Sequence, residues 1–115
     1  MAYSFELEKR IDTAAQELDL RLKKKKMFGG LAYFAKGGNM AFAIRHDDLL
    51  FRVHEGEVDE LMELEGIQAA TMGGRTMRDW LQASGVAIAS DDDLAELLTI
   101  GYDYALSLPP KKALQ

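Results

Sequence analysis

The sequence predicts an α+β domain with three helices and one antiparallel sheet of about five strands. Two observations lead to this prediction. Near both ends of the chain, apolar residues recur every three or four positions, as in amphipathic helices. Between residues 31 and 53 they alternate as in strands, and glycine-rich turns separate strand segments. The expected order is one helix, three or four strands, a short helix, one or two strands and a closing helix.

The composition fits a single soluble domain, expected over residues 1–110, with a frayed tail at 111–115. The chain has no cysteine, which excludes a disulfide framework, a thiolate nucleophile and a cysteine-based zinc site. No apolar run is long enough to span a bilayer, and the N-terminus lacks the apolar segment of a signal peptide. We therefore expect a cytoplasmic protein without membrane association. The formal net charge of −5 disfavours a main function in binding phosphates.

The first helix is expected to begin after Ser4, whose hydroxyl can cap it. Glu6 and Glu8 lie near its positive end, where acidic residues are favourable. An apolar stripe then extends over about five turns. The members of this stripe are Leu7, Ile11, Ala14, Ala15, Leu18 and Leu22.

The middle of the chain predicts two consecutive hairpins. A glycine-rich loop at residues 37–39 separates the strand segments 31–36 and 40–45. If the two residues on either side of this loop are paired with each other, Phe34 and Phe42 face each other in the core. The next turn must contain two or four residues, because a one-residue slip would turn every side chain of the third strand to the wrong face.

The opposite face of this sheet is also apolar, and a sheet with one face in water normally alternates more cleanly. The closing helix has a wide apolar stripe as well. We therefore expect a two-fold homodimer that covers such surfaces. Cover by three helices on both faces is the competing explanation, although the middle helix spans only about two turns. The candidate dimer face comprises Tyr33, Ala35, Ala41, Ala43, Ile100 and Tyr104.

The second half of the chain predicts a short helix at residues 57–65, closed by Gly66, and a strand around Trp80. Ser90 and the three aspartates after it are typical of a helix start, and this closing helix ends before two prolines. Gly101 in its middle costs up to about 1 kcal/mol relative to alanine. A close backbone approach is therefore expected at Gly101.

Several segments, taken in order, resemble a known family. They are Met27-Phe28-Gly29-Gly30, the strand–loop–strand "LAYFAKGGNMAFAIR" with Gly38 and Asn39 in its loop, "DDLLFRV", the glycine turn "MGGRTMRDW" and the closing helix "LAELLTIGYDYALSLPP". The set extends from about Ile11 to Pro110. It resembles the N-terminal domain of the TfoX family, competence regulators also called Sxy.

The resemblance implies a fold similar to that of secretion chaperones and a role in the control of transcription. It implies a protein partner, such as a transcription activator or a polymerase component, and no cofactor. Full-length members carry a second, C-terminal domain. The chain is therefore expected to be a stand-alone N-terminal domain.

The basic run Lys23, Lys24, Lys25 and Lys26 has two interpretations. It can contact phosphates, together with Arg75 in the later glycine turn. Alternatively, the lysines oppose the dipole at the end of the first helix and then point into solvent as a strand begins. The acidic chain as a whole favours the second interpretation.

No other pattern indicates catalysis or metal binding. Gly29 and Gly30 lead into a strand and not into a helix, so they predict a turn and not a phosphate loop. His46 and His54, with their acidic neighbours, match no metal-site spacing. The aromatic residues of the hairpins suit a core better than base stacking. We therefore expect a non-enzymatic regulatory or protein-interaction domain. The alternative is a nucleic-acid-binding accessory protein that uses the lysine run.

Overall fold

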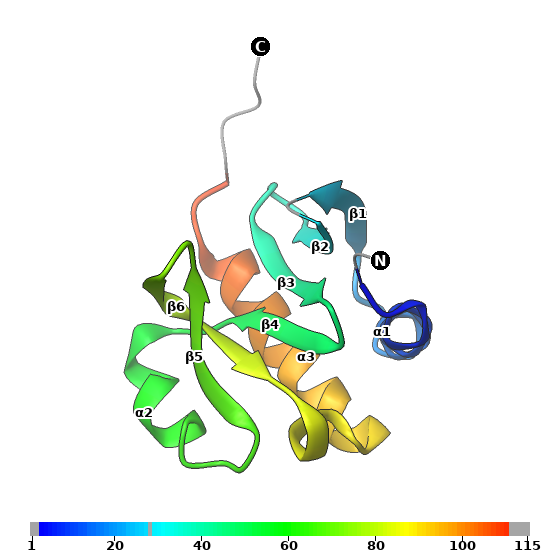
Figure 1. Ribbon diagram of the computed structural model, residues 1–115. Coiled ribbons are helices and arrows are strands. Elements are labelled where there is room, and N and C mark those ends of the chain that lie inside the picture. Colours follow the sequence, from blue (N-terminus) through cyan, green and yellow to red (C-terminus); the bar gives the residue numbers. More distant parts are fainter. Residues whose placement is uncertain (1–2, 28, 111–115) are drawn as a thin grey trace.

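One antiparallel sheet of six strands forms the centre of the described residues, which are 3–27 and 29–110 of this computed structural model. The strand order is β1-β2-β3-β4-β6-β5, as Figure 1 shows. Phe28 and the tail at 111–115 lie outside the described residues. The strands are β1 Leu22–Met27, β2 Gly30–Ala35, β3 Met40–Arg45, β4 Asp48–Arg52, β5 Ile67–Met72 and β6 Arg75–Ala83.

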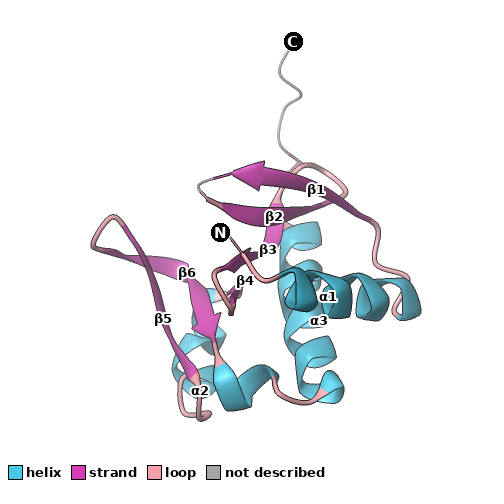
Figure 2. Cartoon of the chain, turned by 45° about the vertical axis from the view of Figure 1, so that its right-hand side comes forward, coloured by secondary structure: helices cyan, strands magenta, loops and turns pink. Residues whose placement is uncertain are grey.

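The helices are α1 Phe5–Glu17, α2 Val58–Leu61 and α3 Asp91–Ser107. Helix α3 packs on β2, β3 and β4, and α1 packs on α3. Figure 2 shows both helices on one side of the sheet, while the β5–β6 hairpin projects away from them. We call the other side of the sheet the open face. The predicted α+β class is confirmed, with one strand more than expected.

The main core lies between the sheet and the two long helices. Tyr33, Phe42 and Phe51 are its largest fully buried side chains. Ile11 of α1 and Leu94 and Leu98 of α3 complete it from the helix side. No helix of the described residues is long and apolar enough to cross a membrane.

The caps and the close approach predicted for the long helices are present. The Ser4 hydroxyl accepts a hydrogen bond from the Leu7 N–H, and the Ser90 hydroxyl accepts one from the Asp93 N–H, each at 3.0 Å. A Cβ atom added at Gly101 would lie 2.6 Å from the Ala41 carbonyl oxygen. Glycine at this position therefore lets α3 lie against β3.

Helix α1 is shorter than the apolar stripe predicts. It ends at Glu17, and the chain reverses at Asp19, which has a φ of 59°. Leu22 therefore begins β1 and does not extend the helix. The lysines at 23–26 all lie within this edge strand, so the prediction that they follow a helix end was wrong. Lysines on an edge strand discourage pairing with another sheet.

The register of the first hairpin differs by one residue from the prediction. Tyr33, not Phe34, pairs with Phe42, and a bulge separates Tyr33 from Phe34. The Ala35 N–H donates to the Asn39 carbonyl, so the loop occupies residues 36–38. Tyr33 therefore enters the core with 1% exposure, and Phe34 takes the opposite face.

The second hairpin has the predicted parity. Its loop holds two residues, His46 and Asp47, and Phe42 pairs with Phe51.

The segment at 57–65 is less helical than expected. A 3-10 turn over Glu55–Glu57 leads into the single α-helical turn of α2, so Gly66 does not close a helix directly.

Candidate interaction site on the open face

A depression of about 340 Å³ lies on the open face, and every residue that lines it belongs to a strand. All six strands contribute, so residues from 27 to 80 meet there. We call it the methionine groove. Its side chains include Met27, Ala32, Met40, Ala43, Arg45, Leu50, Arg52, Met72, Met77 and Trp80.

The floor of the methionine groove is a second, smaller apolar cluster. Leu50, Ala70 and Trp80 are buried in it, and Met40 and Met77 pack against them. The cluster is separated from the main core by the sheet itself. The apolar character predicted for the second sheet face is therefore present, although Ala43 is the one residue of the predicted face that contributes to it.

Methionine dominates this surface. Four of the six methionines of the chain line the groove. The methionine side chain is unbranched and polarisable, so it adapts to partners of different shape. Met72 is 41% exposed at the edge of the groove, and the other three are half-buried. The groove thus offers an adaptable apolar surface.

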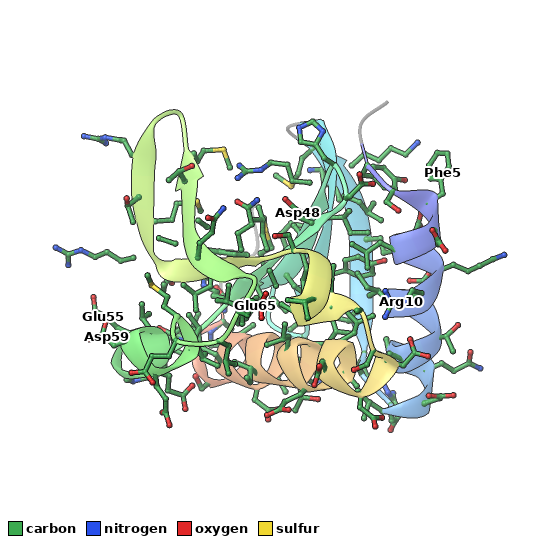
Figure 3. The ribbon with its side chains drawn as sticks, turned by 60° about the horizontal axis from the view of Figure 1, so that its bottom comes forward. Phe5, Arg10, Asp48, Glu55, Asp59 and Glu65 are labelled. Carbon is green, nitrogen blue, oxygen red and sulfur yellow. The ribbon has the colours of Figure 1, made fainter. Side chains whose placement is uncertain are left out.

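Arg45 forms one polar wall of the groove. Its guanidinium donates to the Thr71 carbonyl at 2.9 Å and to Gln82 Oε1 at 3.1 Å. Gln82 Nε2 in turn donates to Asp48 Oδ2 at 2.7 Å. In Figure 3, Asp48 lies between the β5–β6 hairpin and the central strands. These bonds connect β3 to both strands of the hairpin and hold the groove in shape.

Arg52 forms a second polar wall. Its Nε donates to Asp79 Oδ2 at 3.0 Å, and its Nη1 donates to the Met40 carbonyl at 3.3 Å. The guanidinium also lies 5.7 Å from the Trp80 ring centroid, within reach of a cation–π interaction. Arg52 therefore positions the indole at the floor of the groove.

The lysine run is divided between the two faces of β1. Lys24 Nζ donates to Glu8 Oε2 at 2.7 Å and to Asp12 Oδ2 at 2.9 Å on the α1 side. These two hydrogen bonds raise the pKa of Lys24 above its ordinary value. Lys25 pairs with Ala32, which lines the groove, so Lys23 and Lys25 point toward the open face. The run is thus not one continuous patch.

Tyr33 lies beside Lys24 and is the most strongly perturbed group of the helix side. Its hydroxyl donates to Asp12 Oδ1 at 3.1 Å. Burial, followed by the charge of Asp12, raises the pKa of Tyr33 far above its ordinary value near 10. The phenol therefore stays protonated under all ordinary conditions, and we assign it a structural role.

The family-motif residues are structural or lie at the edge of the groove. Met27 lines the groove, Gly29 has a φ of 75°, and Gly38 has a φ of 90°. Gly30 begins β2 and has no positive φ. A Cβ atom there would collide with the Ile44 carbonyl oxygen.

Apart from tyrosine and tryptophan, Asn39 is the one buried residue with a polar side chain among the described residues. Its amide donates to the Pro109 carbonyl at 3.0 Å. It therefore ties the β2–β3 turn to the chain that follows α3.

The candidate dimer face does not exist as one surface. Tyr33, Ala35 and Ala41 are buried in the main core beneath the helices. Their burial follows from the shifted register and from the close approach of α3. Ala43 lines the groove instead, whereas Ile100 and Tyr104 are half-buried on α3.

The remaining candidate residues are not brought together. Arg75 is exposed at the start of β6, next to the glycine turn. His46 lies in a turn, and His54 accepts a hydrogen bond from the Gly56 N–H at 3.0 Å. Over residues 3–27 and 29–110, no three histidine or acidic side chains are grouped so that they could hold a metal ion.

Two other depressions are larger, but both have charged or polar walls. One lies between α1 and α3, where Arg10 donates to Asp91 Oδ1 at 3.1 Å; Figure 3 labels Arg10 on α1. The other lies along β1 and the loop that ends at Gly38. The methionine groove is smaller but mostly apolar, as binding sites usually are.

The methionine groove was not predicted from the sequence. Its methionines are irregularly spaced, at 27, 40, 72 and 77. The one available signal was the apolar second face of the sheet, with Arg45 at the same parity as Ala43.

Comparison of the chain with protein-family models, curated proteins and solved structures finds no match.

Proposed function

We propose that this chain is a non-enzymatic interaction domain that binds a segment of a protein partner in the methionine groove. The observation that carries the proposal is an apolar depression lined by four methionines and a tryptophan, without a helix of the described residues over it. Adaptable methionine surfaces and tryptophan anchors are typical of protein-binding sites.

The resemblance to the TfoX family supports a regulatory setting for this interaction. Under this proposal the partner is a component of the transcription machinery, such as an activator, and the site of action is the cytoplasm. Two-fold self-association remains a separate proposal, no longer supported by the dimer face expected from the sequence. The mass in solution tests it, because a monomer weighs 12.8 kDa.

Site-specific photo-cross-linking in living cells tests the proposed function. A photoreactive phenylalanine analogue replaces Met72 in the groove. The matched control replaces Leu106 on α3, because the two side chains are 41% and 44% exposed. We expect a protein adduct at Met72 that is absent at Leu106. Identical adducts at both positions, or none at Met72, would contradict the proposal.

Nucleic-acid binding is the second candidate function. The observation in its favour is that Lys23, Lys25 and Lys26 are exposed along one edge strand. Binding to duplex DNA at two salt concentrations tests it, because phosphate contacts weaken steeply as salt rises. Absence of binding at low salt would eliminate this candidate.

A further inference from the structure

Charge is strongly segregated between the sheet and the helical segments. The six strands contain eight lysine and arginine residues and two acidic residues, which gives them a formal charge of +6. The segment 55–65 around α2 contains six acidic residues and no basic one, and α3 contains five and none. Figure 3 labels Glu55, Asp59 of α2 and Glu65 from this segment. The chain is therefore acidic as a whole although its sheet is basic.

Part of this positive charge lies at the methionine groove. Arg45 and Arg52 line it, and Lys25 lies two positions before Met27 on the same face of β1. Within the described residues, Arg45 has only neutral hydrogen-bond partners and Lys25 has no ion pair. Arg52 is paired with Asp79, and Asp48 lies opposite Arg45 across the β3–β4 pair. With Lys25, the cations outnumber these carboxylates, so the groove combines an apolar floor with a rim that is positive in balance.

The backbone of the groove restricts the form of the occupant. Every lining residue lies in a strand, and the backbone groups of paired strands bond within the sheet. An extended peptide across this face would leave its own backbone groups without protein partners. A helix satisfies its backbone internally and offers a continuous apolar stripe.

We propose that the methionine groove binds an acidic amphipathic helix of a protein partner. The apolar stripe of this helix contacts the methionines and Trp80, and its flanking carboxylates meet Arg45 and Lys25. This inference rests on the proposed function and adds the chemistry of the partner to it. Nucleic acid is less suited to the groove, because phosphates would contact the rim and leave the apolar floor without a partner.

Two synthetic helical peptides with the same leucine stripe test the inference, one flanked by glutamates and the other by lysines. Affinities are measured by fluorescence anisotropy at low and at physiological salt. We expect the glutamate peptide to bind at least about tenfold more tightly than the lysine peptide, and its affinity to fall with salt. Equal affinities, or a preference for the lysine peptide, would overturn the inference.

Two pairs of variants locate the binding. Lys25→Glu reverses a charge beside the groove. Lys9→Glu reverses a charge at an exposed position of α1, so both variants change the net charge by the same amount. We expect Lys25→Glu to weaken the glutamate peptide about three- to tenfold and Lys9→Glu to have little effect. Met72→Glu should weaken binding at least about tenfold, whereas Leu106→Glu should not. Circular dichroism shows that each variant folds.

The outcomes separate this inference from the proposed function. If neither peptide binds but the photo-cross-link at Met72 persists, the groove binds a protein of other chemistry and the inference is wrong. A third outcome combines three results: duplex DNA binds, Lys25→Glu weakens DNA binding, and the glutamate peptide does not bind. In that case the nucleic-acid alternative replaces both the inference and the proposed function. An equal loss with Lys25→Glu and Lys9→Glu would show a general charge effect and would also overturn the inference.

Discussion

Replacement of Gly101 by alanine tests how closely α3 lies against the sheet. In an unconstrained helix this change stabilises, by up to about 1 kcal/mol. Here the new Cβ atom would lie 2.6 Å from the Ala41 carbonyl oxygen and 3.5 Å from the Arg52 amide nitrogen. The first distance is roughly 0.7 Å shorter than a close carbon–oxygen contact. Because the obstacle is backbone, no side-chain rotation relieves it.

The expected result is a net loss of stability. Overpacking of a well-packed core costs about 1–3 kcal/mol, and a rigid backbone obstacle places the cost in the upper part of this range, at about 2–3 kcal/mol. This cost exceeds the gain of up to about 1 kcal/mol in helix propensity. We expect Gly101→Ala to lower the free energy of unfolding by about 1–2 kcal/mol. Each 1 kcal/mol corresponds to a fall of about 4–8 °C in Tm for a domain near this size. Chemical denaturation and thermal scans measure both quantities.

The control is a pair of variants at Glu96, an exposed position of the same helix. Glu96→Ala should be more stable than Glu96→Gly by about 1 kcal/mol, which gives the local helix propensity. At position 101 the preference should be inverted. If Gly101→Ala is as stable as the wild type or more stable, the conclusion that α3 lies too close to β3 for a side chain at position 101 is wrong.

Three further predictions concern single residues. Gly30→Ala should destabilise by at least about 1 kcal/mol in urea denaturation, because its Cβ meets a backbone carbonyl; an unchanged midpoint would contradict this packing. Tyr33→Phe should cost about 1 kcal/mol near pH 7, through the lost bond to Asp12. Because folding raises the pKa of Tyr33, its contribution to the free energy of unfolding is complete below about pH 10 and declines as the pH rises further. Above this pH the wild type should therefore become no more stable than Tyr33→Phe. A difference in unfolding free energy that stays constant to about pH 11 would refute this. Lys24→Glu should lower Tm more than Lys25→Glu does, because it places a third carboxylate beside two of α1.

Much of the local structure follows from the sequence alone. Ser4 and Ser90 cap helices because their hydroxyls satisfy N–H groups that no helical carbonyl can reach. The parity between Phe42 and Phe51 follows from the two-residue period of strands. The α+β class follows from the order of these patterns. Each of these features depends on residues near one another in the chain.

The tertiary structure decided the features that depend on distant partners. The apolar stripe of the first helix could have continued to Leu22, but residues 22–27 pair with β2 instead. The bulge after Tyr33 moved this side chain into the core, where it meets Asp12 of α1. The hydrophobic period by itself was compatible with either face.

The methionine groove is the clearest case. Met27 and Met77 are fifty positions apart in sequence and have no periodic relation. They line one groove because the sheet places β6 beside β4 and brings all six strands onto the same face. The sequence by itself determined which segments are helices or strands, except at β1, and how much apolar surface they carry. Only the packing of all six strands decided where that surface meets the arginines, because a site formed by side chains from distant strands has no local pattern.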